Sequence, residues 1–224
     1  MPLRNRVDPW GRLQAVNAKG TLLGNRGVLH DDYEEIVAQW RTKAWLTCRL
    51  AWKGRKRTVM SPGSYTELFF LDEATAFSAG HRPCAECRRE RFKEFKSSWI
   101  AANSELIASP AAPISAIDSI IHAERALKGG RKVTYEAELG SLPDGTMVEV
   151  DGAAYLIWQK LLLQWSFAAY TEVEEPHPLR QRVQVLTPAS IVRMLSGGFR
   201  PEVHASAREV IAGSTYAGNR PILR

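Results

Sequence analysis

Residues 69–89 read FFLDEATAFSAGHRPCAECRR, and the rest of the sequence is interpreted from this segment. The double Phe predicts a strand, and Asp72 after it predicts the N-cap of a short helix that Gly80 closes. Pro83 has the backbone φ of a first helical turn, so the sequence predicts a second helix from Pro83 to about Trp99. A strand, a short helix and a basic helix are therefore expected in direct succession.

Two cysteines begin the second predicted helix. Cys84 and Cys87 lie on one helical turn, where free N–H groups and the positive end of the helix dipole favour thiolates. Two thiolates at this spacing bind one Zn²⁺, the expected cofactor. The third cysteine completes a candidate metal set of Cys48, Cys84 and Cys87. An odd number of cysteines argues against a disulfide framework and favours a reducing, cytoplasmic location.

The segment resembles the second half of the Ada-type metal-binding domain, a DNA-phosphate-repair module. In that family a Phe-Phe strand and a short Ala-rich helix lead into Gly-Phe-Arg-Pro-Cys-x-x-Cys-Arg, and His81 takes the place of that Phe here. Residues 44–49, AWLTCR, are similar to the Cys-Arg of the family's first half, and Trp52 stands where its next cysteine falls. The likeness spans about residues 44–92. It implies a zinc-binding, DNA-facing fold, with Cys48 as the candidate that accepts a methyl group from DNA phosphate.

The composition is that of a globular chain with excess basic charge. With 224 residues, 45% hydrophobic and 24% charged, the chain is long enough to bury a core without disulfides. The polar first ten residues and the lack of a long apolar run predict neither a signal peptide nor a membrane partner. No phosphate-cradling Gly-rich loop, serine elbow or dinucleotide fingerprint is present, which argues against nucleotide-driven and classical hydrolase mechanisms.

The net charge of +6 and the pI near 9.4 arise from an uneven distribution. Residues 41–57 contain basic side chains and no acid, and Trp40, Trp45 and Trp52 are interleaved with them. Such a segment attracts polyanions and can stack on exposed bases, although a basic hairpin with core tryptophans is the alternative. DNA, as a duplex with a flipped base, is the expected partner. The predicted nucleic-acid-binding residues are Arg49, Lys53, Arg55, Lys56, Arg57, Arg82, Arg88 and Arg89.

Periodicity and turn signals predict an α+β fold, with helices packed on antiparallel strands and an embedded Cys-rich zinc element. Residues 1–100 and 114–205 are expected to form two regions of one compact unit. The first region is predicted to hold a strand at 21–23, a helix at 33–40 capped by Asp31, and strands at 44–50, 57–60 and 65–71. The second is predicted to hold a helix at 114–127, strands at 131–138, 147–150, 153–158, 167–173 and 182–186, and a helix from Pro188 to Gly197. Asp151-Gly152 predicts a two-residue hairpin turn, and residues from 206 onward lack pattern.

The helix predicted at 114–127 carries the candidate catalytic residues Glu124, His122 and Asp118. Glu124 follows the apolar stripe of that helix, so burial is expected to raise its pKa toward the range of a general acid or base. Asp118 lies one turn before His122 and is placed to orient its imidazole. The alternative is a salt-bridged core edge in which Glu124 pairs with Lys128, Arg131 or Lys132.

The leading functional hypothesis is a DNA glycosylase that excises a flipped damaged or modified base, with Glu124 as the catalytic carboxylate. A second is a non-catalytic, zinc-containing DNA-binding protein. A third is a zinc-dependent nucleobase deaminase, because His122-Ala123-Glu124 and Pro83-Cys84-Ala85-Glu86-Cys87 spell that class's His-x-Glu and Pro-Cys-x-x-Cys in reversed order. His122 and His81 are the candidate fourth zinc ligands.

Overall fold

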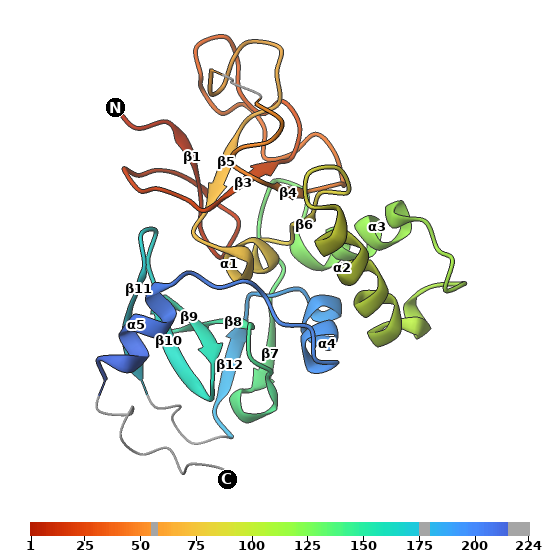
Figure 1. The fold of residues 1–224 in the computed structure, drawn as a ribbon, viewed down its shortest axis with the longest axis vertical. Coiled ribbons are helices and arrows are strands. Elements are labelled where there is room, and N and C mark those ends of the chain that lie inside the picture. The colour runs from red at the N-terminus through yellow and green to blue at the C-terminus, as the bar shows by residue number, and fades with distance from the viewer. Residues whose placement is uncertain (55–57, 175–179, 215–224) are drawn as a thin grey trace.

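The computed structural model describes residues 1–54, 58–174 and 180–214 (Figure 1). It is an α+β fold, and the described residues form two six-stranded, mostly antiparallel sheets and five α-helices. This confirms the predicted fold class. Arg55, Lys56 and Arg57 of the basic segment lie outside the described residues.

The first sheet is built from the N-terminal part of the chain. Its strand order is β2-β1-β5-β3-β4-β6. The pairs β1–β5 and β4–β6 are parallel, and the other neighbours are antiparallel. Its strands are β1 (Arg4–Val7), β2 (Leu13–Ala15), β3 (Leu22–Asn25), β4 (Leu46–Cys48), β5 (Leu68–Phe70) and β6 (Arg82–Pro83).

The second sheet is antiparallel throughout, in the order β11-β10-β9-β8-β12-β7. The Asp151-Gly152 turn joins β8 to β9 as predicted, with φ of +49° and +80° at its two residues. Strand β10 was not predicted, because the turn before it is formed by Gln159 and Lys160, which adopt positive φ without a glycine signal. The strands are β7 (Tyr135–Glu138), β8 (Met147–Val150), β9 (Ala153–Trp158), β10 (Leu161–Trp165), β11 (Tyr170–Glu174) and β12 (Arg182–Val185).

Two of the helices begin and end where local signals place them. Asp72 caps α1 by accepting a hydrogen bond from the Thr75 amide over 2.9 Å, and α4 lies between Pro188 and Gly197. The residues after 205, expected to be irregular, include helix α5. The helices are α1 (Glu73–Ser78), α2 (Arg89–Ala102), α3 (Ile114–Arg125), α4 (Ala189–Ser196) and α5 (Ser206–Ala212), with 3₁₀ turns at Ser104–Leu106 and Leu139–Ser141.

The helix expected at 33–40 is absent, and the prediction was wrong. The Asp31 carboxylate does accept hydrogen bonds from following amides, those of Tyr33 and Glu35, but it does so in a turn. Glu34 has a φ of +64°, which a right-handed helix excludes. His30 and Ile36 then pair as an isolated β-bridge.

The helix expected from Pro83 begins six residues later, at Arg89. Pro83 lies instead in β6, which pairs in parallel with β4. The amide of Arg82 donates to the Trp45 carbonyl over 3.0 Å, and that of Cys84 donates to Thr47 over 2.9 Å. Because these long-range bonds hold the backbone extended, the two cysteines follow a strand and occupy a turn before α2.

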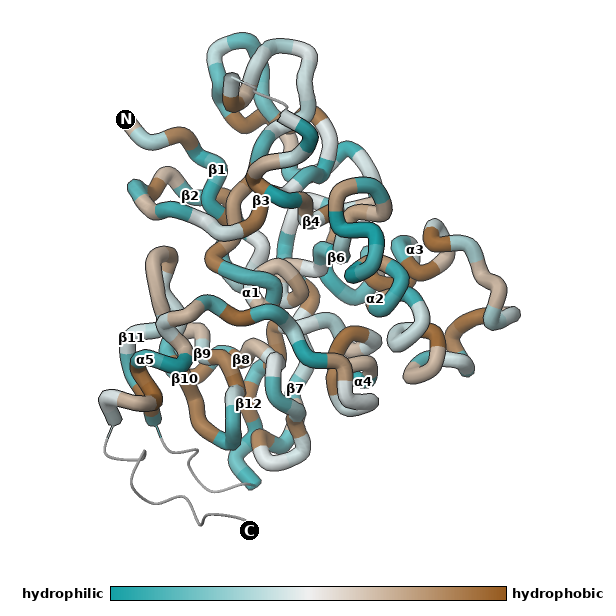
Figure 2. Tube along the Cα trace, viewed as in Figure 1, coloured by the Kyte–Doolittle hydropathy of each residue, from teal (hydrophilic) through white to brown (hydrophobic). Residues whose placement is uncertain are grey.

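Helix α1 lies between the two sheets and all its residues are buried (Figure 1). Tyr170 of β11 donates its hydroxyl to Asp72 over 2.8 Å, and Trp165 of β10 donates its indole N–H to Thr75 over 3.0 Å. Figure 2 shows hydrophobic segments in β9 and β10, from which Leu156 and Leu163 pack in one core with Ala74 of α1. Among the described helices, none combines the length and the apolar character needed to cross a lipid bilayer.

Candidate metal centre

Three cysteine side chains converge at one edge of the first sheet. Cys48 ends β4, while Cys84 and Cys87 lie in the turn between β6 and α2. Their sulfur atoms all lie within 4.8 Å of one another. Cys87 is buried and the other two are half-buried. The predicted cluster is confirmed, it has three members among the described residues, and it can hold a metal ion.

Main-chain N–H groups point at these sulfur atoms. Glu86 donates its amide to Cys84 Sγ over 3.4 Å. A hydrogen bond from the Cys48 thiol, together with these amides, lowers the pKa of Cys84 to about 5, and the same bond raises the pKa of Cys48. Burial raises the pKa of Cys87. The thiolate is therefore favoured at Cys84, and a metal ion that binds here displaces protons from the thiols.

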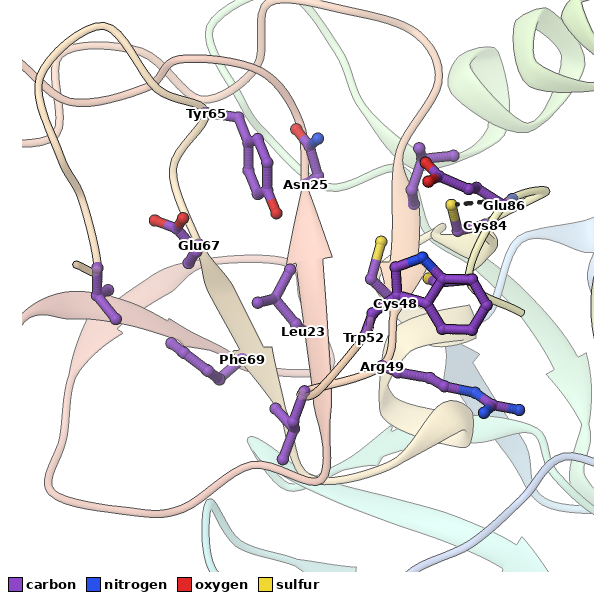
Figure 3. A pocket seen from close by; sticks show the side chains of 14 residues that line it. Leu23, Asn25, Cys48, Arg49, Trp52, Tyr65, Glu67, Phe69, Cys84 and Glu86 are labelled. Carbon is purple, nitrogen blue, oxygen red and sulfur yellow. Dashed lines mark hydrogen bonds between the residues drawn. The ribbon is translucent and has the colours of Figure 1, made fainter. Parts of the chain in front are cut away.

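A pocket of about 350 Å³ adjoins the cysteines (Figure 3). Its floor is one face of β5, β3 and β4, where the register places Phe69, Leu23 and Cys48 side by side. Strand alternation sends the neighbours of these residues, such as Phe70 and Leu22, into the core on the opposite face. The other lining residues are Asn25, Leu46, Arg49, Leu50, Trp52, Val59, Tyr65, Glu67, Cys84, Glu86 and Cys87.

Two residues that line this pocket have a buried polar atom with no hydrogen-bond partner among the described residues: Glu67 Oε1 and Trp52 Nε1. Glu67 is only 2% exposed, and its other oxygen accepts the Met60 amide over 2.8 Å. Sequence reasoning missed Glu67. The signal that could have found it is the alternation Glu67-x-Phe69 entering β5, which puts a carboxylate on the same face as a ring and, across β3, Cys48.

Two of the arginines predicted to contact DNA are buried in ion pairs, and that prediction is corrected. Arg82 forms a two-pronged salt bridge with Asp118, with distances of 2.6 and 2.8 Å. Arg88 donates to Thr47 and to Glu73, each over 2.8 Å. Both guanidinium groups therefore make their hydrogen bonds within the protein, where α2 and α3 pack on the first sheet.

Three other predicted DNA contacts are exposed near the cysteines: Arg49, Lys53 and Arg89. Arg49 lies over the Trp52 ring at 5.8 Å and Lys53 at 5.4 Å. Arg49 and Arg89 also line a second hollow, of about 420 Å³, on the far side of Trp52. These cations, unlike Arg82 and Arg88, can reach a polyanion.

The structure separates the three predicted catalytic residues. Because Asp118 is held by Arg82, it does not orient His122. The His122 ring packs edge-on against Trp40 at 5.2 Å and contacts Arg125 at 3.0 Å, and burial lowers its pKa to about 4. His122 is outside the sulfur cluster, so it is not the fourth ligand.

Glu124 does not lie in the apolar surroundings that the helical wheel predicts. Its carboxylate accepts hydrogen bonds from the amide and the hydroxyl of Ser190, at 3.0 and 2.5 Å, and lies 3.8 Å from Arg193. The partners expected from sequence, Lys128, Arg131 and Lys132, are replaced by residues of α4. Its catalytic role stays a prediction.

His81, the other candidate ligand, is buried inside the first sheet. Its Nε2 accepts a hydrogen bond from Arg26 Nε over 3.1 Å, and its ring packs on Phe70 at 4.6 Å. It therefore lies outside the sulfur cluster. The comparisons with known proteins add no template: no family model, curated protein or solved structure matches the chain.

Proposed function

We propose that this chain is a zinc-containing DNA-binding protein of the Ada type, in which Cys48, Cys84 and Cys87 hold the metal. The observation that carries the proposal is the convergence of three sulfur atoms within 4.8 Å. Zn²⁺ fits this donor set because it prefers thiolates in tetrahedral geometry at about 2.3 Å, which puts neighbouring sulfur atoms under 4 Å apart after a small contraction. The amides that already donate to the sulfurs are the outer contacts that thiolate metal sites use.

Three protein ligands leave one position of a tetrahedral metal for another group. In zinc proteins this arrangement belongs to sites that bind water or a ligand, whereas closed structural sites use four protein ligands. The pocket that adjoins the cysteines gives that position room. The metal would therefore serve both to tie β4 to the β6–α2 turn and to hold a group that enters the pocket.

The DNA part of the proposal is supported by exposed charge around the cysteines. Arg49, Lys53 and Arg89 are exposed, and the first two lie over the ring of Trp52. Such cations neutralise phosphates and release counterions, while the indole offers a stacking surface. The glycosylase and deaminase hypotheses stay predictions. The carboxylates that they use, Glu124 and Asp118, are bound by Ser190 and Arg82.

Two measurements test this function. Elemental analysis of the purified protein is expected to find one zinc per chain in the wild type and a loss in both Cys84→Ser and Cys48→Ser. Fluorescence anisotropy with a labelled duplex is expected to show salt-dependent binding. The slope of the logarithm of the binding constant against the logarithm of the salt concentration reports the number of phosphate contacts. Replacing Arg49, Lys53 and Arg89 together by Ala is expected to reduce this slope by the equivalent of up to about three contacts.

The matched control for the charge variants is Arg208→Ala, on α5 and exposed at the far side of the molecule (Figure 1). It is expected to bind the duplex like the wild type. A metal-free wild-type protein would overturn the zinc assignment. Wild-type protein that holds zinc but ignores duplexes at low salt would overturn the DNA assignment alone.

A further inference from the structure

We propose that the pocket beside the three cysteines binds a single purine or pyrimidine base, with Glu67 as the residue that accepts a hydrogen bond from its N–H edge. This inference deepens the proposed function, because nucleic acid is the natural source of such a base. It assigns a ligand and a recognition residue to the side of the pocket that lies beyond Leu23, away from the cysteines (Figure 3).

The first support is the state of the Glu67 carboxylate. A carboxylate oxygen has lone pairs that need donors, and an unsatisfied buried acceptor lowers stability unless a ligand completes it. Glu67 is 2% exposed and its Oε1 has no donor in the described part of the chain, although its Oε2 accepts a hydrogen bond from the Met60 amide. The hydrogen bond from the Met60 amide gives Oε2 a structural role, because it holds Met60 in a backbone conformation with a φ of +57°. The other oxygen is left for a ligand to complete, and Glu67 is one of the residues that line the pocket.

The second support is a donor on the opposite side. Trp52 Nε1 is also buried, and no acceptor contacts it among the residues that the structure describes. Trp52 lies beside Cys48 and Cys84, while Glu67 and Tyr65 lie beyond Leu23 (Figure 3). The pocket thus offers one unpaired acceptor and one unpaired donor on separate sides. A ligand that satisfies both carries an N–H on one edge and an acceptor on another.

The third support is the shape and polarity between these groups. The floor is formed by Leu23, Leu46 and Phe69, and aromatic rings of Trp52 and Tyr65 stand at its sides. Phe69 and Cys48 are separated by the width of two strand spacings, about 10 Å, and Glu67 precedes Phe69 by two residues on the same face. A floor of this width accommodates one flat ring system. A planar heterocycle with polar edges fits, and a volume of about 350 Å³ lies within the range of ligand sites.

Among planar heterocycles, nucleobases have these polar edges, and a nucleic acid bound at the protein surface would supply them. The exposed cations Arg49 and Lys53 lie at Trp52, on the cysteine side of the pocket. A strand held there by its phosphates places an extruded base within reach of the floor. Extrusion costs least at an unpaired or mismatched nucleotide, so such sites are expected to be bound in preference to intact duplex.

The test uses Glu67→Gln in the full-length protein. The amide oxygen of Gln still accepts from Met60, while its NH₂ group replaces the unpaired acceptor by a donor, so the fold is retained and recognition is inverted. Saturation-transfer NMR with free guanosine, adenosine and cytidine is expected to show base contacts with the wild type. The affinity for these nucleosides is expected to fall about 10- to 100-fold in Glu67→Gln. Glu138→Gln, an exposed carboxylate on β7, is the control and is expected to bind like the wild type.

A second arm distinguishes a free nucleoside from a base in DNA. Duplexes with one unpaired nucleotide are expected to bind more tightly than fully paired duplexes of the same sequence, and Glu67→Gln is expected to remove that preference while keeping the salt-dependent binding. Trp52→Phe, which keeps a ring but lacks the N–H, is expected to weaken both the binding of nucleosides and the preference for the unpaired duplex. Nucleoside binding without a preference for the unpaired duplex would identify the free nucleoside as the source.

Equal binding by Glu67→Gln and wild type in both arms would overturn this inference. The proposed function would then stand if zinc and salt-dependent duplex binding persist. Conversely, nucleoside binding that depends on Glu67 in a protein with no affinity for duplexes would retain the pocket assignment and overturn the DNA assignment.

Discussion

At the scale of single residues, the most unusual environment is the group of cations around Trp45. The guanidinium groups of Arg26 and Arg125 lie over its ring, at 3.9 and 3.8 Å. Both also donate to main-chain carbonyls, of Gly11 and Gly80 respectively. Burial lowers the pKa of Arg26 to about 9 and that of Arg125 to about 8. Carbonyl groups and the indole therefore take the place of carboxylates as partners of these cations.

Lys132 belongs to the same group and gives a pH-dependent prediction. Its ammonium donates to the Ser78 carbonyl, and burial followed by the nearby charge of Arg125 lowers its pKa from 10.5 to about 7. Between about pH 7 and pH 10 the unfolded chain holds a proton that the folded protein lacks, so the free energy of unfolding rises with pH. In Lys132→Met this contribution is absent, and the slope is expected to fall by up to one proton, about 1.4 kcal/mol per pH unit.

Urea unfolding at several pH values between 7 and 10 measures both slopes. Lys19→Met is the matched control, because Lys19 is exposed and its ammonium is hydrated in both states. Equal slopes for the wild type and Lys132→Met would show that the Lys132 ammonium is not desolvated in the folded protein.

Sequence alone could not separate the buried arginines from the exposed ones. Arg88 and Arg89 are neighbours with the same side chain, yet Arg88 is 6% exposed and binds Glu73, whereas Arg89 faces solvent. What decides between them is the position of Glu73 and Thr47, which come from other elements. The cysteine cluster was predictable because an odd number of cysteines argues against disulfides, and Cys84 and Cys87 have the spacing of a metal-binding pair that Cys48 can join.

At the scale of elements, helix α4 depends on another helix for its cap. Pro188 precedes it and provides no side-chain hydrogen bond. The Glu124 carboxylate of α3 supplies that acceptor, bonding the amide and the hydroxyl of Ser190 in the first turn. A negative charge at this place also complements the helix dipole. The residue predicted to be catalytic thus has an observed role in joining α3 to α4.

Glu124→Ala is expected to lower the free energy of unfolding by about 1–2 kcal/mol, the usual effect of losing an N-terminal cap. Glu124→Gln is expected to cost less, since its amide oxygen still accepts from Ser190. Chemical denaturation measures both, with Glu105→Ala as a control because that exposed carboxylate faces the same Arg193 at 3.7 Å. Unchanged stability in Glu124→Ala would remove the capping role. Loss of abasic-site formation in a stable Glu124→Gln protein would support the glycosylase hypothesis.

Elements specified by local chemistry were predictable, and those specified by distant partners were not. Asp72, Asp151-Gly152 and Gly197 mark boundaries that the structure reproduces. Pro83 carries an equally strong helix-start signal, but the parallel pairing of β6 with β4 overrides it. Propensity is weaker than a pair of long-range backbone hydrogen bonds, so only knowledge of β4 could have corrected the prediction.

At the scale of the whole molecule, the two sheets meet at the buried N-terminal end of α1. Glu73 is wholly buried and binds both Arg88 and Arg91 of the α2 region, while the Glu202 amide donates to it from the C-terminal part of the chain. Asp72, next to it, binds Tyr170. Breaking such buried charged networks leaves unpaired charges, so this junction couples the sheets strongly. The cysteine cluster lies at the edge of the first sheet, and the hydrogen bond from Arg88 to Thr47, beside Cys48, links it to this network.

Metal removal is therefore expected to loosen the first sheet's edge before it unfolds the molecule. The proposed metal, held by Cys48, Cys84 and Cys87, would close the chain between β4 and the β6–α2 turn. Its binding free energy would add to stability, by about 2.7 kcal/mol at a free concentration one hundred times the Kd. A chelator is expected to lower the Tm of the wild type and to speed proteolysis of residues 49–54 and 58–66, and added Zn²⁺ is expected to reverse both. Cys87→Ser is expected to start from the lowered Tm and to be insensitive to chelator. If chelation strips the metal while the Tm and the proteolytic pattern stay unchanged, the cluster does not act as a clamp, and β4–β6 pairing alone holds that edge.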